Sequence, residues 1–145
     1  MRIVIQRCYD ASVSVNGQIV GKINKGIMIL VGFTKGDNEQ ILNKMAYKTA
    51  NMRIFEDENS KMNKNLKAIN GDVLSISQFT LYANCKDGNR PSFVEAAKPE
   101  QANELYEYFC SECKKNDIKV EKGIFGADMK VSLLNDGPVT IVIEK

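Results

Sequence analysis

Histidine is absent from this 145-residue chain. Without an imidazole side chain, the sequence cannot assemble a Ser-His-Asp or Cys-His catalytic group, and it cannot form a metal site that uses histidine ligands. Hydroxyls, carboxylates, amines, backbone dipoles and the substrate itself are the remaining means of catalysis. Any enzyme with this sequence must therefore work without an imidazole acid or base.

Long apolar runs are also missing. None reaches the length needed to span a bilayer. The start of the chain lacks the continuous apolar segment of a signal peptide, because Arg7 and Asp10 interrupt it. We therefore expect a cytoplasmic protein with no membrane partner.

Neither sign of charge is in large excess. Twenty Lys and Arg residues stand against 18 Asp and Glu residues, which gives a formal net charge of +2. Proteins that coat nucleic acid without sequence preference use bulk positive charge, and this chain has too little of it. Only a local basic patch could serve nucleic-acid binding.

The four cysteines are Cys8, Cys85, Cys110 and Cys113. Their spacing is not that of a disulfide framework, and a cytoplasmic chain keeps its thiols reduced. Cys110 and Cys113 form a CxxC inside a helical pattern, without the second CxxC or the histidine that would complete a zinc site. We predict two neighbouring thiols on one helix face, no metal site and no cofactor.

Apolar alternation and β-branched residues predict a largely β fold. The predicted strands cover residues 2–15, 18–23, 26–33, 53–57, 72–83, 118–122, 128–135 and 138–144. Asn16-Gly17 predicts a hairpin between the first two strands. Because the chain has no repeat, low-complexity tract or linker, we predict one α+β domain over residues 1–145. It should have a curved, mostly antiparallel or mixed sheet, with two main helices packed on one side.

The two predicted helices each have one apolar face. The first covers residues 37–52, with Asp37 as its N-cap and Met45 on the buried side. The second covers residues 98–117 and has Pro99 near its start. Its apolar face carries residues at helical spacing: Ala102, Leu105, Phe109 and Cys113.

Three segments carry polar or rigid residues that a simple sheet would not need. "SQFTL" (77–81) puts polar side chains on both faces of a predicted strand, which is costly unless they are paired; a solvated edge strand is the alternative. "GNRPSF" (88–93) surrounds a proline turn with an arginine and an aromatic residue, which suits either phosphate contact or an ordinary surface loop. "NDGPVT" (135–140) adds Pro138 where Asp-Gly alone would turn, so it is either a turn that happens to contain proline or a rigid main-chain feature with a function.

Together these segments resemble the D-aminoacyl-tRNA deacylase family, in the branch called DTD. "SQFTL" and "NDGPVT" match the two signatures of the family without a departure. "MRIVIQR", "RIFEDENSKMN", "GNRPSF" and "ADMKVSLLNDGPVT" match in the expected order, so the resemblance spans nearly the whole chain. Ser60 stands where Gly is common, and "KNL" follows Met62-Asn63 where the family varies; neither departure touches the signatures.

The resemblance implies a carboxylic ester hydrolase of translation quality control. Family members cleave the ester between a D-amino acid and the 3′-terminal adenosine of tRNA, and they also act on glycyl-tRNA, including tRNA(Ala) mischarged with glycine. They are homodimers with a barrel-like core, and they need no metal. Gly137-Pro138 would be a cis peptide that reaches from one subunit into the pocket of the other. There its carbonyls would accept the α-ammonium of the substrate, and an L side chain would clash.

The resemblance also implies roles for residues of the first signature. The catalytic candidates are Ser77, Gln78, Phe79 and Thr80. Backbone N–H groups around Phe79 and Thr80 would stabilise an oxyanion, and Gln78 would orient the substrate. The Thr80 hydroxyl is either a positioning group or a nucleophile, and the lack of an evident base in the sequence favours positioning.

The substrate-binding candidates lie outside the first signature: Gly137, Pro138, Met129, Phe125, Arg90 and Phe93. Met129 and Phe125 would be pocket walls, although core packing is an equal interpretation for both. Arg90 would contact a phosphate, with Phe93 packed nearby. Two other functions stay open: an RNA-binding module that uses the Arg90 loop without turnover, and a different ester or amide hydrolase on the same fold.

Overall fold

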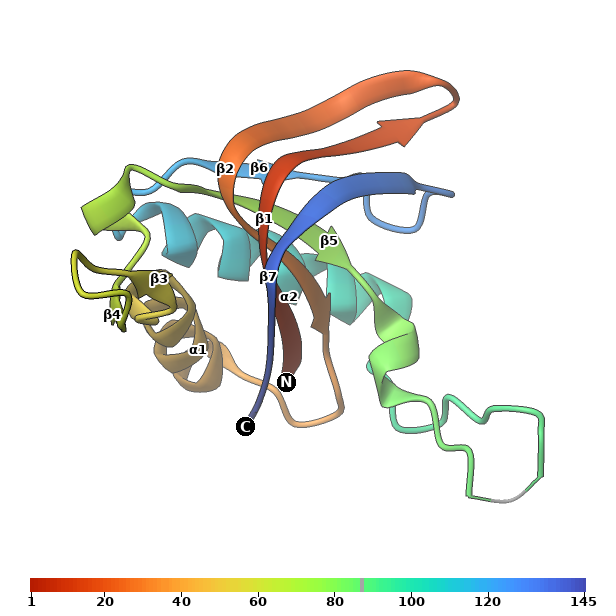
Figure 1. The fold of residues 1–145 in the computed structure, drawn as a ribbon. Helices are drawn as coiled ribbons and strands as arrows, with labels where there is room; N and C mark the ends of the chain where they lie inside the picture. Colours follow the sequence, from red (N-terminus) through yellow and green to blue (C-terminus); the bar gives the residue numbers. More distant parts are fainter. Residues whose placement is uncertain (87) are drawn as a thin grey trace.

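One five-stranded sheet with two helices against it makes up most of the molecule (Figure 1). The structure is a computed structural model, and it describes residues 1–86 and 88–145. The strand order is β6-β5-β2-β1-β7. β5 (Asp72–Ser77) runs parallel to β2, and β6 (Val120–Lys122) runs parallel to β5, while the other pairs are antiparallel. The predicted α+β class with a mixed sheet is confirmed.

A long hairpin forms the centre of the sheet. β1 (Arg2–Val15) pairs antiparallel with β2 (Gln18–Gly32) along almost its whole length. Asn16 and Gly17 make the turn with φ values of 50° and 79°. These are the left-handed values that a type I′ turn requires, so the hairpin predicted from Asn-Gly is confirmed.

β2 is a single strand where the sequence predicts two, at 18–23 and 26–33. Lys25, which lies between them, stays paired with β1, so the ladder is not interrupted. Gly26 adopts φ +149°, and a Cβ atom there would lie 1.9 Å from the carbonyl oxygen of Asp72. The glycine is needed because β5 approaches the β2 backbone at this point, and it does not end the strand.

β7 (Lys130–Glu144) replaces the two strands predicted at 128–135 and 138–144. It pairs antiparallel with β1 on both sides of the Gly-Pro sequence. The register shifts there, so that residues 136–139 bulge out opposite the single residue Arg7. The "NDGPVT" segment is therefore a bulge within one edge strand, and the prediction of a turn between two strands is wrong.

The strand predicted at 72–83 is too long. It ends at Ser77, and Phe79–Tyr82 form a 3-10 helix, η2. The backbone N–H of Gln78 still donates to the Val31 carbonyl oxygen at 2.7 Å, which continues the bonding to β2. Beyond it the backbone closes i→i+3 turns, so only Ser77 of the polar residues in "SQFTL" stays in β5, and Gln78 and Thr80 lie beyond the strand.

Both helices cover the same face of the sheet, as predicted (Figure 1). They are α1 (Glu39–Asn51) and α2 (Pro99–Lys114), which pack against each other. α2 begins at Pro99, one residue after the predicted start at 98, and ends before the predicted residue 117. Its largest buried side chain is Tyr106, while Leu105 is only partly buried, so the predicted apolar face is rotated slightly.

The N-cap of α1 is Asn38, and the prediction of Asp37 at this position is wrong. The Asn38 Oδ1 atom accepts a hydrogen bond from the Ile41 N–H at 3.2 Å. Asp37 is instead buried, and its carboxylate lies 2.6 Å from the α-ammonium of Met1. It also accepts from the Thr34 N–H at 2.8 Å. A buried carboxylate needs such partners, and the sequence could not reveal a partner so distant in the chain.

Apolar side chains fill both faces of the sheet. On β2, Ile27, Ile29 and Val31 face the helices, whereas Met28 and Leu30 face the opposite, concave side. This follows from the alternation of side chains along a strand. The strands curve over the concave side, and the sheet stays open there (Figure 1). The barrel-like core implied for a dimer stays a prediction.

A small hairpin follows α1. β3 (Phe55–Glu56) pairs with β4 (Met62–Lys64), so the strand predicted at 53–57 is shorter than expected and has a partner that was not predicted. The described residues form seven strands where eight were predicted. None of the helices that the structure describes is both long and apolar enough to cross a membrane.

Candidate active site

A cavity of about 410 Å³ opens where β5 ends and η2 begins. Five predicted site residues line it: Ser77, Gln78, Phe79, Phe125 and Met129. Most of the other lining is apolar and comes from β2, α2 and β7, with Leu30, Ala102 and Leu133 as examples. An apolar hollow with a few polar groups at one side is the usual form of a small-molecule site.

The side chains of Gln78 and Thr80 are joined by a hydrogen bond. The Gln78 Nε2 atom donates to the Thr80 hydroxyl oxygen at 2.6 Å. Thr80 is exposed, and it does not contribute to the cavity lining as Gln78 does. The bond fixes the Gln78 amide at the edge of the cavity. In the part of the chain that the structure describes, no carboxylate or amine is hydrogen-bonded to the Thr80 hydroxyl.

Aromatic side chains form the mouth of the cavity. The rings of Phe79 and Phe93 meet edge to face, with their centroids 5.1 Å apart. Both are exposed, Phe79 by 56% and Phe93 by 37%. A second hollow, of about 350 Å³, lies beside the first and shares Phe79 and Phe125 with it. The structure therefore places Phe93 beside the cavity, in contact with Phe79.

Buried polar groups on α2 contact residues next to the cavity. The Tyr106 hydroxyl donates to the Ser75 carbonyl oxygen at 2.8 Å, and its ring packs 6.1 Å from that of Phe125. Burial raises the pKa of Tyr106 above its ordinary value. Burial likewise raises the pKa of the thiols of Cys110 and Cys113, so both stay protonated. They share the buried side of α2, as predicted for the CxxC.

Gly123 supports the cavity wall at Met129, although no motif in the sequence points to it. A Cβ atom at Gly123 would lie 2.4 Å from the Met129 sulfur, so the methionine side chain rests directly on the glycine. Met129 is thereby held as a cavity wall rather than buried in the core between sheet and helices. Only a non-local contact explains this glycine, and a single sequence carries no signal for it.

Arg7 is the main residue that the sequence analysis missed. Its side chain is only 8% exposed, and it lies opposite the β7 bulge. The Nη1 atom donates to the Ile54 carbonyl oxygen at 2.9 Å, and the Nε atom donates to the Asp136 carbonyl oxygen at 3.2 Å. The Nε atom also lies 2.9 Å from the Asp136 carboxylate. The signal in the sequence was an arginine within the predicted first strand, residues 2–15.

The Gly137-Pro138 peptide bond is cis, as the resemblance implies. Gly137 has φ +118°, which favours glycine. Both residues are exposed, and neither belongs to the lining of the cavity over the described residues of the same chain. Arg7 anchors the segment by its hydrogen bond and ion pair with Asp136, the residue before Gly137. A single chain therefore does not bring Gly137-Pro138 to the residues of the first signature.

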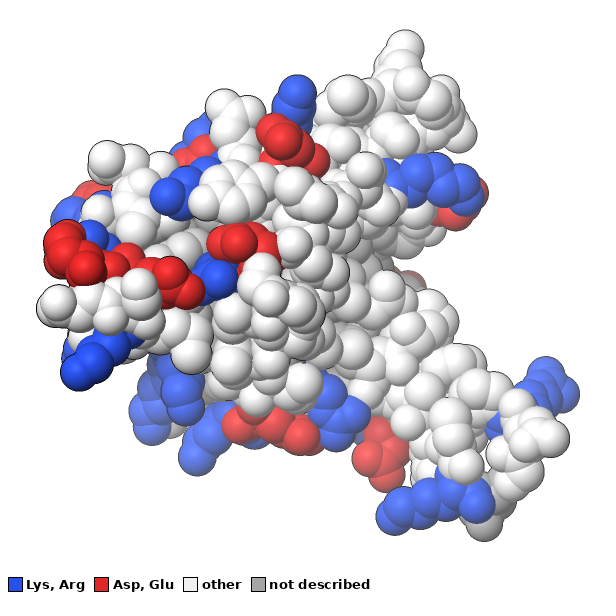
Figure 2. Space-filling view, viewed as in Figure 1, with Lys and Arg blue, Asp and Glu red and all other residues white. Residues whose placement is uncertain are grey.

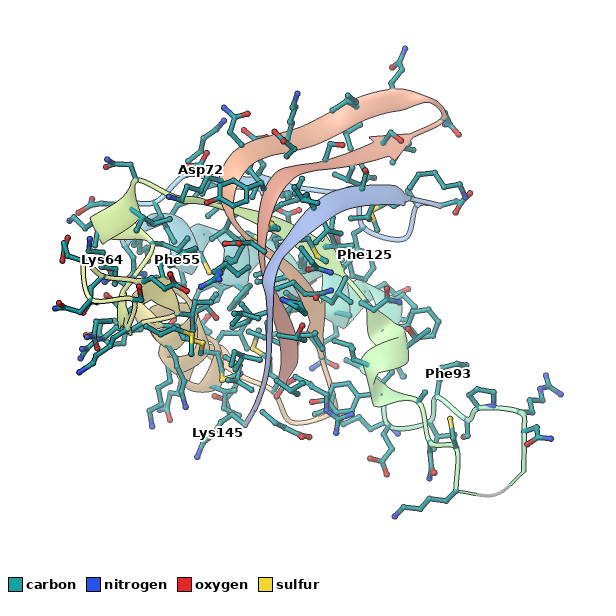
Figure 3. All side chains as sticks on the ribbon, in the orientation of Figure 1. Phe55, Lys64, Asp72, Phe93, Phe125 and Lys145 are labelled. Atoms are coloured by element: carbon teal, nitrogen blue, oxygen red, sulfur yellow. The ribbon has the colours of Figure 1, made fainter. Side chains whose placement is uncertain are left out.

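Arg90 also lies away from the cavity. It sits on an exposed loop that extends from the body of the molecule beyond Phe93 (Figure 3). The root of this loop is closed by mutual backbone hydrogen bonds between Asn84 and Ser92, at 2.7 and 2.9 Å. Arg90 is thus at the surface and does not contribute to the lining of the cavity.

The chain was compared with known proteins through a family model and through curated relatives. The model of the family described as D-Tyr-tRNA(Tyr) deacylase matches residues 4–144. The D-aminoacyl-tRNA deacylase of Lactobacillus gasseri is 56% identical over 144 residues, which is 99% of each chain. That of Bacillus cytotoxicus is 55% identical over the same share of both chains.

Two solved structures share the fold of this chain. The c-Myc DNA Unwinding Element Binding Protein superposes with a TM-score of 0.93 at 38% identity, and the match covers 100% of this chain and 99% of that one. A probable eukaryotic D-amino acid tRNA deacylase has a TM-score of 0.86 at 17% identity, with 98% and 97% covered, and shares the fold. With a family model that matches 4–144 and relatives above half identity over nearly the whole length, the chain belongs to the D-Tyr-tRNA(Tyr) deacylase family.

Proposed function

We propose that this protein hydrolyses the ester bond of D-aminoacyl-tRNA and releases the free D-amino acid and the tRNA. The observation that carries the proposal is the convergence of Ser77, Gln78 and Phe79 on one mostly apolar cavity. The relatives named D-aminoacyl-tRNA deacylase support it, because they are 56% and 55% identical to this protein and their alignments cover 99% of the chain. We place the activity in the cytoplasm, where tRNA is charged.

Water is the nucleophile in the proposed reaction. It attacks the ester carbonyl, and the 3′ oxygen of the ribose leaves. An aminoacyl ester is already activated and has a vicinal hydroxyl, so positioning and oxyanion stabilisation can supply the catalysis. The N–H groups of Phe79 and Thr80 are suited to the oxyanion because they begin η2, and the first N–H groups of a helix have no acceptor within it.

Thr80 acts as a positioning residue in this proposal. Its hydroxyl oxygen accepts the Gln78 amide N–H at 2.6 Å, which orients the amide toward the substrate. A nucleophilic hydroxyl needs a base to remove its proton. Gln78 cannot act as one because an amide nitrogen donates. The hydrogen bond therefore supports positioning over covalent catalysis.

Stereoselectivity would come from Gly137-Pro138 of a second copy of the chain. The segment is exposed, and Arg7 fixes it through Asp136. It lies on β7, an edge strand whose Leu134 and Val142 side chains are 62% and 60% exposed. Exposed apolar residues on an edge strand support association with another copy. Carbonyl groups of the inserted segment would then accept the α-ammonium of the substrate.

The proposed filter works by exclusion. With the ammonium and the ester fixed, exchanging the enantiomers exchanges the α-hydrogen and the side chain. The side chain of an L residue would then point into the Gly137-Pro138 backbone, whereas that of a D residue would point away. Glycine has hydrogen at both positions, so glycyl-tRNA should pass the filter and be cleaved.

Turnover on matched substrates tests the function. D-tyrosyl-tRNA, L-tyrosyl-tRNA and glycyl-tRNA are incubated with enzyme at a concentration far below that of the substrate. We expect multiple turnovers on the D-tyrosyl and glycyl esters and almost none on the L-tyrosyl ester. Binding without turnover would instead indicate a non-catalytic RNA-binding module. Equal cleavage of the two tyrosyl enantiomers would contradict the filter.

A further inference from the structure

The short helix η2 lies directly on the end of β2. A Cβ atom at Gly32 would be 2.9 Å from the Gln78 carbonyl oxygen and 3.0 Å from the Leu81 Cβ atom. Only a residue without a Cβ leaves room for so close an approach. At the same point the Gln78 N–H donates to the Val31 carbonyl oxygen at 2.7 Å. The end of β2 therefore fixes η2 where Gln78 leads into it.

Arg2 holds the other end of η2. Its Nη1 atom donates to the Leu81 carbonyl oxygen at 2.5 Å, and its guanidinium carbon lies 5.0 Å from the centroid of the Tyr82 ring. The last carbonyl groups of a helix have no partner within it, and a basic side chain can satisfy them. A cation over an aromatic face adds an electrostatic attraction. Arg2 thus contacts the last two residues of η2.

The strand register brings Arg2 to this position. On β1, Arg2 pairs with Gly32 of β2 and with Glu144 of β7. Residues directly opposite each other in antiparallel strands project from the same face of the sheet. The Arg2 side chain therefore leaves the sheet where Gly32 admits η2. Its Nη2 atom lies 2.7 Å from the Glu144 carboxylate, so the planar guanidinium bonds Leu81 and Glu144 at once.

The ion pair with Glu144 would not by itself make Arg2 important. The two side chains are 31% and 54% exposed, and exposed ion pairs contribute little to stability. Red and blue atoms both reach the surface around the chain ends that Figure 1 marks, so this surface has mixed charge (Figure 2). The hydrogen bond to the Leu81 carbonyl differs, because it is partly buried. The contact with η2 is therefore the one that distinguishes Arg2 from an ordinary surface cation.

We propose that Arg2 is a positioning residue for the deacylation and acts through η2. Over the described residues Arg2 is not part of the cavity lining, so it does not act by contact with the substrate. By holding the end of η2, it fixes Phe79 and Thr80 at the start of the helix, and with them the Gln78 amide that is bonded to the Thr80 hydroxyl. The inference rests on the proposed function, in which these residues hold the ester. Without Arg2, η2 is fixed at one end only.

Three variants test the role of Arg2. Arg2→Met keeps an apolar stem of similar length and removes the contacts with Leu81, Tyr82 and Glu144. The matched control is Glu144→Gln, which removes the charge of the ion pair but leaves the bond from Arg2 to Leu81 in place. Arg2→Lys is the conservative variant, because an ammonium keeps the charge without the planar fork.

Kinetics on D-tyrosyl-tRNA give the first measurement. We expect Arg2→Met to lower kcat by at least about fivefold while KM stays within about twofold of wild type, because misplaced groups cost rate more than ground-state binding. Arg2→Lys should recover part of the lost kcat. Glu144→Gln should leave both constants within about twofold of wild type, since it removes only an exposed charge.

Amide hydrogen exchange gives the second measurement. The N–H groups of Leu81 and Ala83 close the turns of η2 by bonds to the carbonyl oxygens of Gln78 and Thr80, at 3.3 and 3.0 Å. Local opening of η2 exposes these groups to exchange. They should exchange faster in Arg2→Met than in wild type or Glu144→Gln, while the amides of β1 and β2 keep their wild-type rates.

A kcat that Arg2→Met leaves unchanged, or lowers no more than Glu144→Gln does, would overturn the inference. Faster exchange throughout the sheet would also overturn it, because Arg2 would then support the whole fold instead of η2. If the wild-type protein did not cleave D-tyrosyl-tRNA, the proposed function would fail. Exchange at Leu81 and Ala83 would still show whether Arg2 holds η2, so the two failures are distinguishable.

Discussion

Arg7 allows a prediction that joins stability to selectivity. Its guanidinium is the only cation hydrogen-bonded to the β7 bulge among the described residues, and it links that bulge to the Ile54 carbonyl. Replacing Arg7 by Met keeps an apolar stem of similar length but removes all three contacts. The bulge that carries Gly137-Pro138 would then lose the link through Arg7 to the Ile54 carbonyl. We expect the fold to survive and the selectivity to fall.

The size of the stability loss follows from the burial of each contact. The hydrogen bond to Ile54 is buried, and one from a charged donor is worth about 1.5–3 kcal/mol. The Asp136 side chain is 34% exposed, so its ion pair with Arg7 is screened and contributes about 0–1 kcal/mol. Arg7→Met should therefore lower the free energy of unfolding by about 1.5–4 kcal/mol. A domain with a typical stability of about 5–15 kcal/mol remains folded after this loss.

Urea unfolding measures the loss of stability. The ratio of kcat/KM for D-tyrosyl-tRNA to that for L-tyrosyl-tRNA measures the loss of selectivity. Arg7→Lys should be intermediate, since an ammonium lacks the planar fork that reaches two acceptors. Arg53→Met is the control, because Arg53 is exposed and, among the described residues, its side chain is hydrogen-bonded only to Asn63. A ratio that Arg7→Met leaves unchanged, or a stability loss no larger than that of the control, would refute the reasoning.

Three further changes probe other parts of the molecule. Asp37→Asn should lower the free energy of unfolding by about 3–5 kcal/mol in urea titrations, because it leaves the buried α-ammonium of Met1 without its 2.6 Å counter-ion. Gly123→Ala should lower kcat/KM by displacing Met129, and adding Met129→Ala should restore part of it in the same deacylation assay. Thr80→Ala should keep measurable deacylation activity, since a positioning hydroxyl contributes only partly. Mass spectrometry of the wild-type protein during turnover should detect no acyl-enzyme.

Local sequence signals predicted those elements whose causes are local. The type I′ hairpin at Asn16-Gly17 needs only two residues that tolerate positive φ. The start of α2 at Pro99 needs only a residue whose missing N–H is harmless in the first turn. In both cases the physical reason lies within a few residues of the sequence, so the prediction and the structure agree.

Predictions failed where a distant contact decides the outcome. Asp37 has the chemistry of an N-cap, but the Met1 ammonium offers it a stronger partner than a backbone N–H. The Gly137-Pro138 segment has the chemistry of a turn, but β1 continues to pair on both sides of it. Neither competitor is visible in a local window. The site positions themselves came from a resemblance to known signatures, and their roles remain predictions.

The two signatures occupy similar places in the sheet, which explains why neither has the residue pattern of a regular strand. Each places polar or rigid residues where the sheet's hydrogen bonding is interrupted: "SQFTL" at the end of β5, and "NDGPVT" in the bulge of β7. Interrupted pairing frees backbone groups that a regular ladder would consume. The first signature leaves the N–H groups of Phe79 and Thr80 at the start of η2, and the second places the exposed residues Gly137 and Pro138 on an edge strand. In the proposed reaction of this histidine-free chain, backbone donors of the first signature would hold the ester, and backbone acceptors of the second would hold its ammonium.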